Sequence, residues 1–238
     1  MNKSAMRRIR IPDHAALFPV LWNEIKPRNG ERVLDIGMGS KATSASALAS
    51  QGFEVVGMDI KPECGKFSKT LYIPVVACDA AAMPFKEKAF DYCAAVFSLH
   101  EMDPKHHGTI IREMGSISRI IIIIEPLLRK DGLGGEIDRL WFEAMRSAGK
   151  FEKYQSMRYW DALVRSLKVK SVRRILINIV GDITEKSPSD MCAMMDDYFR
   201  KEGASNRYII ELKRLGARLR NEGMPRSEVL LLIAELQL

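Results

Sequence analysis

The chain has 238 residues, of which 47% are hydrophobic and 28% are charged. This composition is ordinary for a globular protein with a buried core, and it excludes disordered and fibrous architectures. The chain has 37 lysines and arginines against 30 aspartates and glutamates, so its net charge is +7. Such an excess favours anionic partners without requiring any of them.

The four cysteines form no C-x-x-C pair, which gives little support to a disulfide framework or a zinc site. We therefore expect no metal and a reducing cytoplasm. The longest apolar stretches, such as Ile120–Ile124 and Val229–Ala234, are far shorter than the roughly 18 residues that span a bilayer. No apolar segment follows the basic N-terminal residues, so neither a membrane span nor a signal peptide is expected.

Residues 1–30 are expected to be a helical segment, with an amphipathic helix over about Asp13–Ile25. Short β-branched runs then alternate with helical patterns, which indicates a parallel sheet covered by helices on both faces. The expected strands are Arg32–Ile36, Glu54–Asp59, Pro74–Asp79, Phe90–Phe97, Arg119–Glu125, Val172–Val180 and Glu228–Leu236. The fifth of them contains five consecutive isoleucines without alternation, as expected for a central strand buried on both faces.

Residues 181–225, between the last two expected strands, have helical signals of their own. One helix starts near Ser187, with Met191, Met194 and Met195 at the spacing of one helix face. A second runs from about Asn206 to Asn221 and is followed by a glycine and a proline. We interpret this segment as an insertion within a single domain that spans 1–238.

The segment Val33–Ala42 places Gly37 and Gly39 between a strand and a helix, where glycines allow a ligand to approach the backbone and the helix N-terminus offers free N–H groups. With Asp59 twenty residues after Gly39, it formally fits the dinucleotide fingerprint. A P-loop is excluded, because Gly65-Lys66 is followed by Phe67.

Asp35 distinguishes between the two cofactors that bind to such a loop, a dinucleotide and S-adenosylmethionine. A carboxylate two residues before the first glycine would repel a pyrophosphate, but it complements the ammonium group of S-adenosylmethionine. Asp59 and Asp79 follow the next two strands, where carboxylates accept hydrogen bonds from hydroxyl groups. The sulfonium cofactor is therefore favoured over a dinucleotide.

The strings VLDIGMGS, VVGMDI, CDAAAMPF and FDYCAAVFSLHEM, in this order over about residues 30 to 126, resemble the class I S-adenosylmethionine-dependent methyltransferases. The resemblance is to the group related to the ubiquinone and menaquinone biosynthesis methyltransferases. It implies a Rossmann-like α/β fold, with a seven-stranded, mostly parallel sheet, helices on both faces and an antiparallel last strand. It also implies S-adenosylmethionine as cofactor and S-adenosylhomocysteine as product.

The same resemblance assigns the cofactor-binding residues. Asp35, Gly37 and Gly39 would hold the methionyl end, Asp59 with its neighbour Ile60 the ribose, and Asp79 with Ala80 the adenine edge; Phe97 and Ser98 would line the methyl-bearing side. Lys41 replaces the third glycine of the family pattern, and we expect it to bind the cofactor's carboxylate.

His100 and Glu101, just past the fourth expected strand, are the candidate catalytic residues. A histidine of near-neutral pKa accepts the proton that a nucleophile loses on methylation. The alternative is that His100 is present without acting as a base. His106 and His107, beside Gly108 at an expected helix start, are interpreted as surface or capping residues.

The sequence therefore predicts a cytoplasmic S-adenosylmethionine-dependent methyltransferase that acts on a small or medium-sized acceptor. Its acceptor pocket is expected between the Ser98–Asp103 loop, the N-terminal helix and the 181–225 insertion. One alternative is an RNA methyltransferase, prompted by the positive charge but lacking an Asn-Pro-Pro-Tyr motif. The other is a cofactor-binding regulatory protein without transfer activity, which the unusual Lys41 raises.

Overall fold

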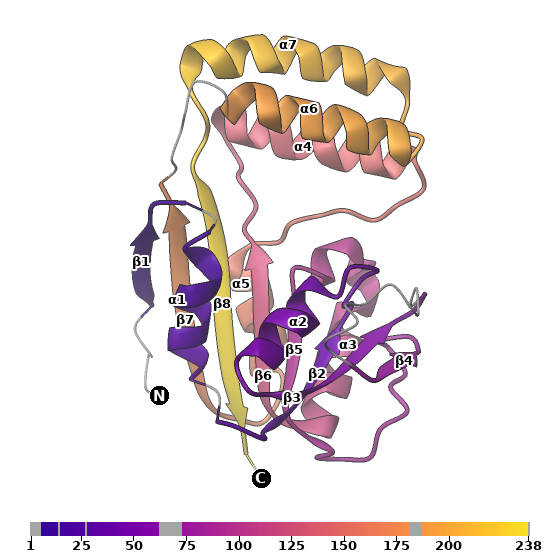
Figure 1. The fold of residues 1–238 in the computed structure, drawn as a ribbon, viewed down its shortest axis with the longest axis vertical. Coiled ribbons are helices and arrows are strands. Elements are labelled where there is room, and N and C mark those ends of the chain that lie inside the picture. Colours follow the sequence, from indigo (N-terminus) through magenta and orange to yellow (C-terminus); the bar gives the residue numbers. More distant parts are fainter. Residues whose placement is uncertain (1–5, 14, 27, 62–72, 181–186, 238) are drawn as a thin grey trace.

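The computed structural model describes residues 6–13, 15–26, 28–61, 73–180 and 187–237. Eight strands form one sheet in the order β1-β7-β8-β6-β5-β2-β3-β4 (Figure 1). Their bounds are β1 Arg7–Ile11, β2 Arg32–Ile36, β3 Glu54–Asp59, β4 Val75–Ala77, β5 Phe90–Val96, β6 Ser118–Pro126, β7 Val169–Ile179 and β8 Ser227–Leu236. Only β8 runs antiparallel to its neighbours, β6 and β7, whereas all other pairs in this sheet are parallel.

The α/β class, the mostly parallel sheet and the antiparallel last strand are confirmed, but the expected number of seven strands is one too few. The additional strand is β1, which pairs in parallel with β7 at the edge of the sheet. It lies in the N-terminal segment that the sequence predicted to be helical. Ile11 is buried and Ile9 packs against the core, while Arg8 and Arg10 are exposed, so this short segment alternates as an edge strand does.

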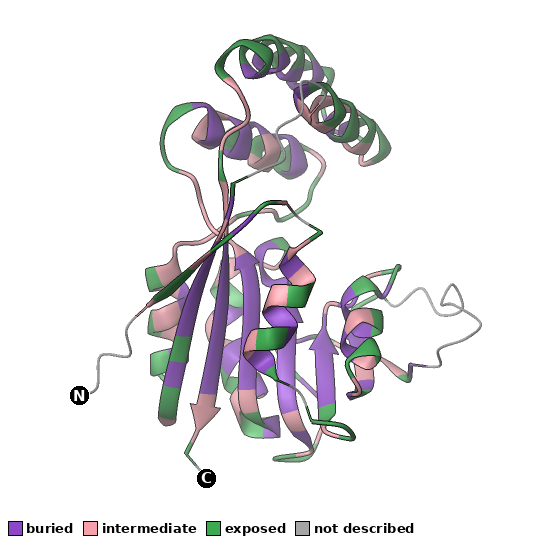
Figure 2. Ribbon diagram, turned by 60° about the vertical axis from the view of Figure 1, so that its left-hand side comes forward, coloured by how far each residue is buried: buried purple, intermediate pink, exposed green. Residues whose placement is uncertain are grey.

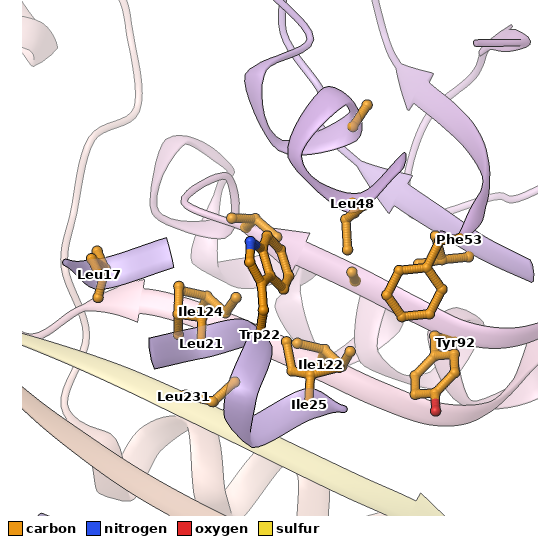
Figure 3. Packing of buried hydrophobic residues seen from close by; sticks show 14 of the residues in the cluster. Leu17, Leu21, Trp22, Ile25, Leu48, Phe53, Tyr92, Ile122, Ile124 and Leu231 are labelled. Carbon is orange, nitrogen blue, oxygen red and sulfur yellow. The ribbon is translucent and has the colours of Figure 1, made fainter. Parts of the chain in front are cut away.

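Helices cover both faces of the sheet. α1 (Leu17–Ile25) and α2 (Thr43–Ser50) pack on one face, and α3 (Pro104–Ile117) and α5 (Met157–Arg165) pack on the other (Figure 1). The isoleucines of β6 serve both layers: Ile122 and Ile124 join α1 and α2 in one cluster (Figure 3), and Ile121 and Ile123 join α3 and α5 in the other. The central strands are accordingly buried over most of their length (Figure 2).

Three further helices form what we call the helical cap: α4 (Gly132–Ser147), α6 (Ser187–Lys201) and α7 (Asn206–Glu222). They lie together beyond one end of the sheet and share a hydrophobic core of their own (Figure 1). α6 and α7 belong to the segment expected between the last two strands, but α4 comes from the connection between β6 and α5. The cap is thus assembled from two separate stretches of the chain. Within the described ranges no helix is long and apolar enough to cross a membrane.

Candidate functional site

The first candidate site lies where the strand order reverses. β2 pairs with β3 on one side and with β5 on the other, and ligands of open α/β sheets bind beyond the carboxyl ends of the strands at such a point. A cavity of about 410 Å³ opens there, which we call the glycine-loop cavity. It is lined by Gly37, Gly39, Met58, Asp59, Ile60, Cys78, Asp79, Ala80, Ser98, Glu101, Met102, Asp103, His106 and Ile110.

Gly37 brings the end of β2 against the end of β5. Its φ is +69°, and a Cβ added there would lie 2.7 Å from the Cβ of Ser98 and 3.3 Å from the Cε of Met102. Ser98 is fixed on the same side, because its hydroxyl donates to the carbonyl of Ile36 at 2.7 Å. A residue without a side chain is therefore required at position 37, both for the backbone conformation and for this close packing.

Two strand-end acids shape the opposite wall of the cavity. The Oδ2 of Asp59 accepts from the backbone N–H of Gly39 at 3.1 Å, and its Oδ1 accepts from the N–H of Lys61 at 2.9 Å. The Oδ1 of Asp79 accepts from the N–H of Ala81 at 2.8 Å. These backbone bonds hold both carboxylates in place, and each oxygen retains capacity to accept from a hydroxyl or amino group.

Asp35 lies behind the cavity rather than in its wall. Its side chain is fully buried, Oδ2 accepts from the hydroxyl of Ser44 at 2.6 Å, and Oδ1 has no hydrogen-bond partner among the described residues. Burial raises the pKa of this carboxyl group to about 7, against the effect of the Ser44 hydrogen bond. A buried oxygen without a partner is costly, and a cationic group brought close to it would remove that cost.

Most of the residues expected to bind the cofactor are brought together by the fold. Those that line the glycine-loop cavity are Gly37, Gly39, Asp59, Ile60, Asp79, Ala80 and Ser98. Lys41 is exposed and Phe97 faces a different cavity, so neither lines this one. The sequence analysis placed Asp103 in the loop of the acceptor pocket and did not identify His106 as a lining residue. The signal for both was Asp103-Pro104, an N-cap and first-turn pattern that starts α3 beside the strand end.

A second cavity of about 430 Å³ lies on the other side of the segment 97–101, and we call it the α1-side cavity. Most of its wall is apolar, and its polar groups include those of His100, Arg129 and Tyr154. The full lining is Leu17, Phe18, Phe97, His100, Pro126, Leu127, Arg129, Tyr154, Ser227, Glu228 and Val229. Two of the three expected contributors to an acceptor pocket, the N-terminal helix and the loop after β5, are therefore present, and no described residue of 187–225 lines it.

His100 is the centre of a buried polar cluster between the two cavities. Its Nδ1 lies 2.6 Å from Oε2 of Glu125, and its Nε2 lies 3.4 Å from Oε1 of Glu152. The other oxygen of Glu125 accepts from the backbone N–H groups of Ser98 and Leu99, at 3.0 and 2.8 Å. Burial disfavours the charged imidazole, but the hydrogen bond and the charge of Glu125, assisted by Glu152, outweigh it and raise the pKa of His100 to about 9.

Glu152, which is partly buried, and Glu101, which is exposed, complete this cluster. Desolvation raises the pKa of Glu101, and it raises the pKa of Glu152 to about 7. The sequence analysis did not identify Glu125 or Glu152. Glu125 ends the isoleucine run of β6, and Glu152 lies in the irregular connection between α4 and α5. A pKa of about 9 leaves His100 protonated at neutral pH, so it is poorly suited to act as a base in this state.

The interpretation of His107 as a surface or capping residue is wrong. The side chain is fully buried on α3, where Nε2 lies 2.9 Å from the carbonyl of Leu99 and Nδ1 lies 2.9 Å from the hydroxyl of Tyr159. Burial lowers the pKa of His107, so the neutral ring donates to Leu99 and accepts from Tyr159. It thereby holds the 3-10 turn η1 (Leu99–Glu101) that carries His100 and Glu101.

Residues 33–119 match the family described as "Methyltransferase domain". This part of the chain is similar to methyltransferase domains. The expected resemblance to class I S-adenosylmethionine-dependent methyltransferases is thus confirmed, and the matched residues carry most of the glycine-loop cavity.

Two curated relatives are demethylmenaquinone methyltransferases. The chain is 28% identical over 106 residues to that of Corynebacterium kroppenstedtii, with 42% of this chain and 44% of the relative covered. It is 34% identical over 94 residues to that of Beutenbergia cavernae, with 39% and 38% covered. The chain thus matches less than half the length of these relatives. Among solved structures, the YcgJ protein of Bacillus subtilis has the same fold, with a TM-score of 0.64, 14% identity and coverage of 94% of this chain and 100% of that one.

Proposed function

We propose that the protein transfers the methyl group of S-adenosylmethionine to a small or medium-sized acceptor. The observation that supports this most strongly is the convergence of Gly37, Gly39, Asp59 and Asp79 on one cavity of a methyltransferase domain. The donor set also fits this cofactor, because strand-end carboxylates suit its hydroxyl and amino groups and the unpartnered oxygen of buried Asp35 suits a cationic group.

In this proposal the cofactor occupies the glycine-loop cavity and the acceptor occupies the α1-side cavity. The bound cofactor supplies an activated methyl group on its sulfonium. The chain's own residues orient and enclose the reactants: Asp59 accepts from the ribose hydroxyls, Gly37 leaves room for close approach, and α1 with Tyr154 excludes water from the acceptor side.

The acceptor cavity supports a small-molecule substrate. Its volume is within the range of pockets for small ligands, and its walls include Phe18, Phe97 and Leu127. Arg129 also lines this cavity; its Nε and Nη2 are paired with Asp138, and its Nη1 suits an oxygen-bearing acceptor. The two relatives named demethylmenaquinone methyltransferase support an acceptor with a ring. Three described cysteines, Cys78, Cys93 and Cys192, are free, which fits the proposed cytoplasmic location.

Calorimetry tests the cofactor assignment. We expect S-adenosylmethionine and S-adenosylhomocysteine to bind, and NAD to bind much more weakly. Asp59→Ala should weaken binding of S-adenosylhomocysteine at least tenfold, which is about 1.4 kcal/mol, because charged-acceptor hydrogen bonds to the ribose are lost. The matched control is Glu54→Ala, which removes an exposed carboxylate at the opposite end of the same strand and should leave affinity unchanged.

An unchanged dissociation constant for Asp59→Ala would reject the assignment of the glycine-loop cavity. Transfer is tested separately, by incubation with methyl-labelled cofactor and a panel of phenolic, quinol and amine acceptors. Cofactor binding without transfer to any of them would favour the regulatory alternative, and salt-sensitive transfer to RNA would favour the nucleic-acid alternative.

A further inference from the structure

The polar cluster between the two cavities has the donor set of a metal site. His100, Glu101 and Glu152 each direct one ligand atom to a common region, and these three atoms lie within 4.8 Å of one another in the described part of the chain. Two carboxylates and one imidazole are a set that first-row divalent ions, zinc in particular, bind in proteins. The residues come from η1 and from the connection between α4 and α5, so the fold and not a sequence motif brings them together.

The separation of one pair of ligand atoms, those of His100 and Glu152, is one that two ligands of a single ion would have. The Nε2 of His100 and the Oε1 of Glu152 are 3.4 Å apart, which is longer than the 2.7–3.2 Å typical of N–H···O hydrogen bonds. Two ligands of a tetrahedral ion, each about 2.1 Å from the metal, lie about 3.4 Å apart. The side chains of His100 and Glu152 are also well buried, with 9% and 8% of their areas exposed.

Glu125 provides the outer contact that a metal-binding histidine needs. Its Oε2 lies 2.6 Å from the Nδ1 of His100, and its other oxygen is held by the backbone N–H groups of Ser98 and Leu99. A carboxylate on Nδ1 fixes the orientation of the imidazole and presents Nε2 as the ligand atom. Glu152, in contrast, receives no hydrogen bond from a main-chain N–H of the described residues, although the indole N–H of Trp141 lies beside it.

The backbone holds the two halves of this cluster together. The N–H of Lys153 donates to the carbonyl of His100 at 2.9 Å, and the ring of Tyr154 packs edge-on against His100 with centroids 5.2 Å apart. Glu152 is therefore placed next to His100 by its own neighbours in the chain. The nearby cation Lys150 is already paired with Glu202, in the turn that follows α6.

We propose that His100, Glu101 and Glu152 form a binding site for one divalent transition-metal ion of the zinc type, with Glu125 orienting His100. The ion lies between the two cavities, because His100 lines the α1-side cavity and Glu101 lines the glycine-loop cavity. The site stands apart from the methyl-transfer proposal, since it rests on the cluster alone. It also revises the expectation of no metal.

Calorimetry with ZnCl₂ on metal-free, tagless full-length protein tests the site. We expect one Zn²⁺ per chain, with Mg²⁺ failing to compete at equal concentration because it prefers oxygen ligands. His100→Gln and Glu152→Gln should each weaken binding at least tenfold, and Glu125→Gln by about 10–100-fold through the lost outer contact. Glu143→Gln, which changes an exposed carboxylate on α4, is the matched control and should bind as the unaltered protein does.

A second measurement does not depend on any variant folding. Co²⁺ added to the unaltered protein should give the intense visible absorption of a tetrahedral site, and Zn²⁺ should abolish it. Zn²⁺ should also shift the side-chain ¹⁵N resonances of His100 and leave those of His106 in place. Equal zinc affinity in His100→Gln, Glu152→Gln and the unaltered protein, or a Co²⁺ spectrum without tetrahedral bands, would overturn the proposal.

Discussion

Gly37 and Gly39 have the same left-handed backbone but different surroundings, so they form a matched pair for a stability test. An alanine at position 37 would meet the Cβ of Ser98 at 2.7 Å, whereas an alanine at position 39 has nothing within 4 Å. Left-handed strain costs about 1–2 kcal/mol at either position, and overpacking adds about 1–3 kcal/mol at position 37 alone.

We therefore expect Gly37→Ala to lower the free energy of unfolding by about 2–5 kcal/mol, and Gly39→Ala by about 1–2 kcal/mol. Urea unfolding at neutral pH measures both values. Equal losses in the two variants would mean that β5 gives way to the new methyl group, and the close packing of the two strand ends would not be a constraint.

Asp35 makes stability depend on pH. Its pKa is about 7 in the folded protein, raised by burial from 3.8, so the folded state binds a proton that the unfolded state releases. This contribution is fully present below about pH 4 and is lost as the pH rises through 7. The free energy of unfolding of the unaltered protein should thus fall between pH 4 and 8, relative to Asp35→Asn, by at most about 4 kcal/mol.

The measurement is a set of urea unfolding curves for both proteins across this pH range, since their difference cancels the effect of other titrating groups. Bound S-adenosylmethionine should reduce the difference, because its cationic group favours the ionised carboxylate. If the two stability curves run parallel from pH 4 to 8, Asp35 is already ionised in the folded protein and its environment is more polar than the structure implies.

The turn η1 is held in place by α3, whose His107 contacts both η1 and α5. Neutral His107 accepts from the hydroxyl of Tyr159 and donates to the carbonyl of Leu99. Tyr159→Phe removes the donor and leaves a buried ring nitrogen unsatisfied, which costs about 1–3 kcal/mol. We expect this loss in urea unfolding, together with a change in the side-chain ¹⁵N shifts of His107.

The control for this variant is Tyr198→Phe, which removes a hydroxyl from a ring that is stacked on Trp141 with centroids 5.1 Å apart. It should change stability by less than about 0.5 kcal/mol. If Tyr159→Phe behaves like this control, the hydroxyl contributes nothing to the placement of η1, and the hydrogen bond from His107 to Leu99 and the packing of His107 on Trp160 hold the turn.

The elements differ in how well the sequence predicts them. β2 and β3 have the predicted bounds, because each contains a run of largely buried residues that follows one exposed charged residue. β1 has only two inward isoleucines, and three arginines surround them. This pattern is too short and too charged to predict a strand from the sequence. Its pairing depends on β7, which is more than 150 residues away, and no local pattern reports such a contact.

For the whole molecule, the sequence predicts the cofactor side of the site far better than the acceptor side. Gly37, Asp59 and Asp79 each lie at or just after the end of a strand, so the positions of the strands alone place them at one edge of the sheet. Glu125, Glu152 and the α1-side cavity depend on how α1, β8 and the α4–α5 connection pack around that edge. Packing between elements that are distant in the chain leaves no periodic pattern in the sequence, so it cannot be predicted from such a pattern.

The helical cap offers a test of how cooperative the molecule is. The sequence groups Met194 and Met195 on one methionine face, but the structure separates them: Met195 is 2% exposed within the cap's own core, and Met194 is 59% exposed. Met195→Ala should cost about 2–5 kcal/mol through the cavity it leaves, and Met194→Ala should cost little. Because the cap's core is a cluster separate from the two cores of the sheet, we expect this loss to be local.

Native-state amide exchange followed by mass spectrometry measures this locality. In Met195→Ala, exchange should speed up in α4, α6 and α7 and stay unchanged in β2, β5 and β6, while Met194→Ala should match the unaltered protein throughout. Added S-adenosylhomocysteine should protect the strand ends around the glycine-loop cavity in all three proteins, since no described residue of α6 or α7 lines it. Equal acceleration in the cap and in the central strands would show a single cooperative unit, in which the cap transmits its instability to the site and is not an independent cover.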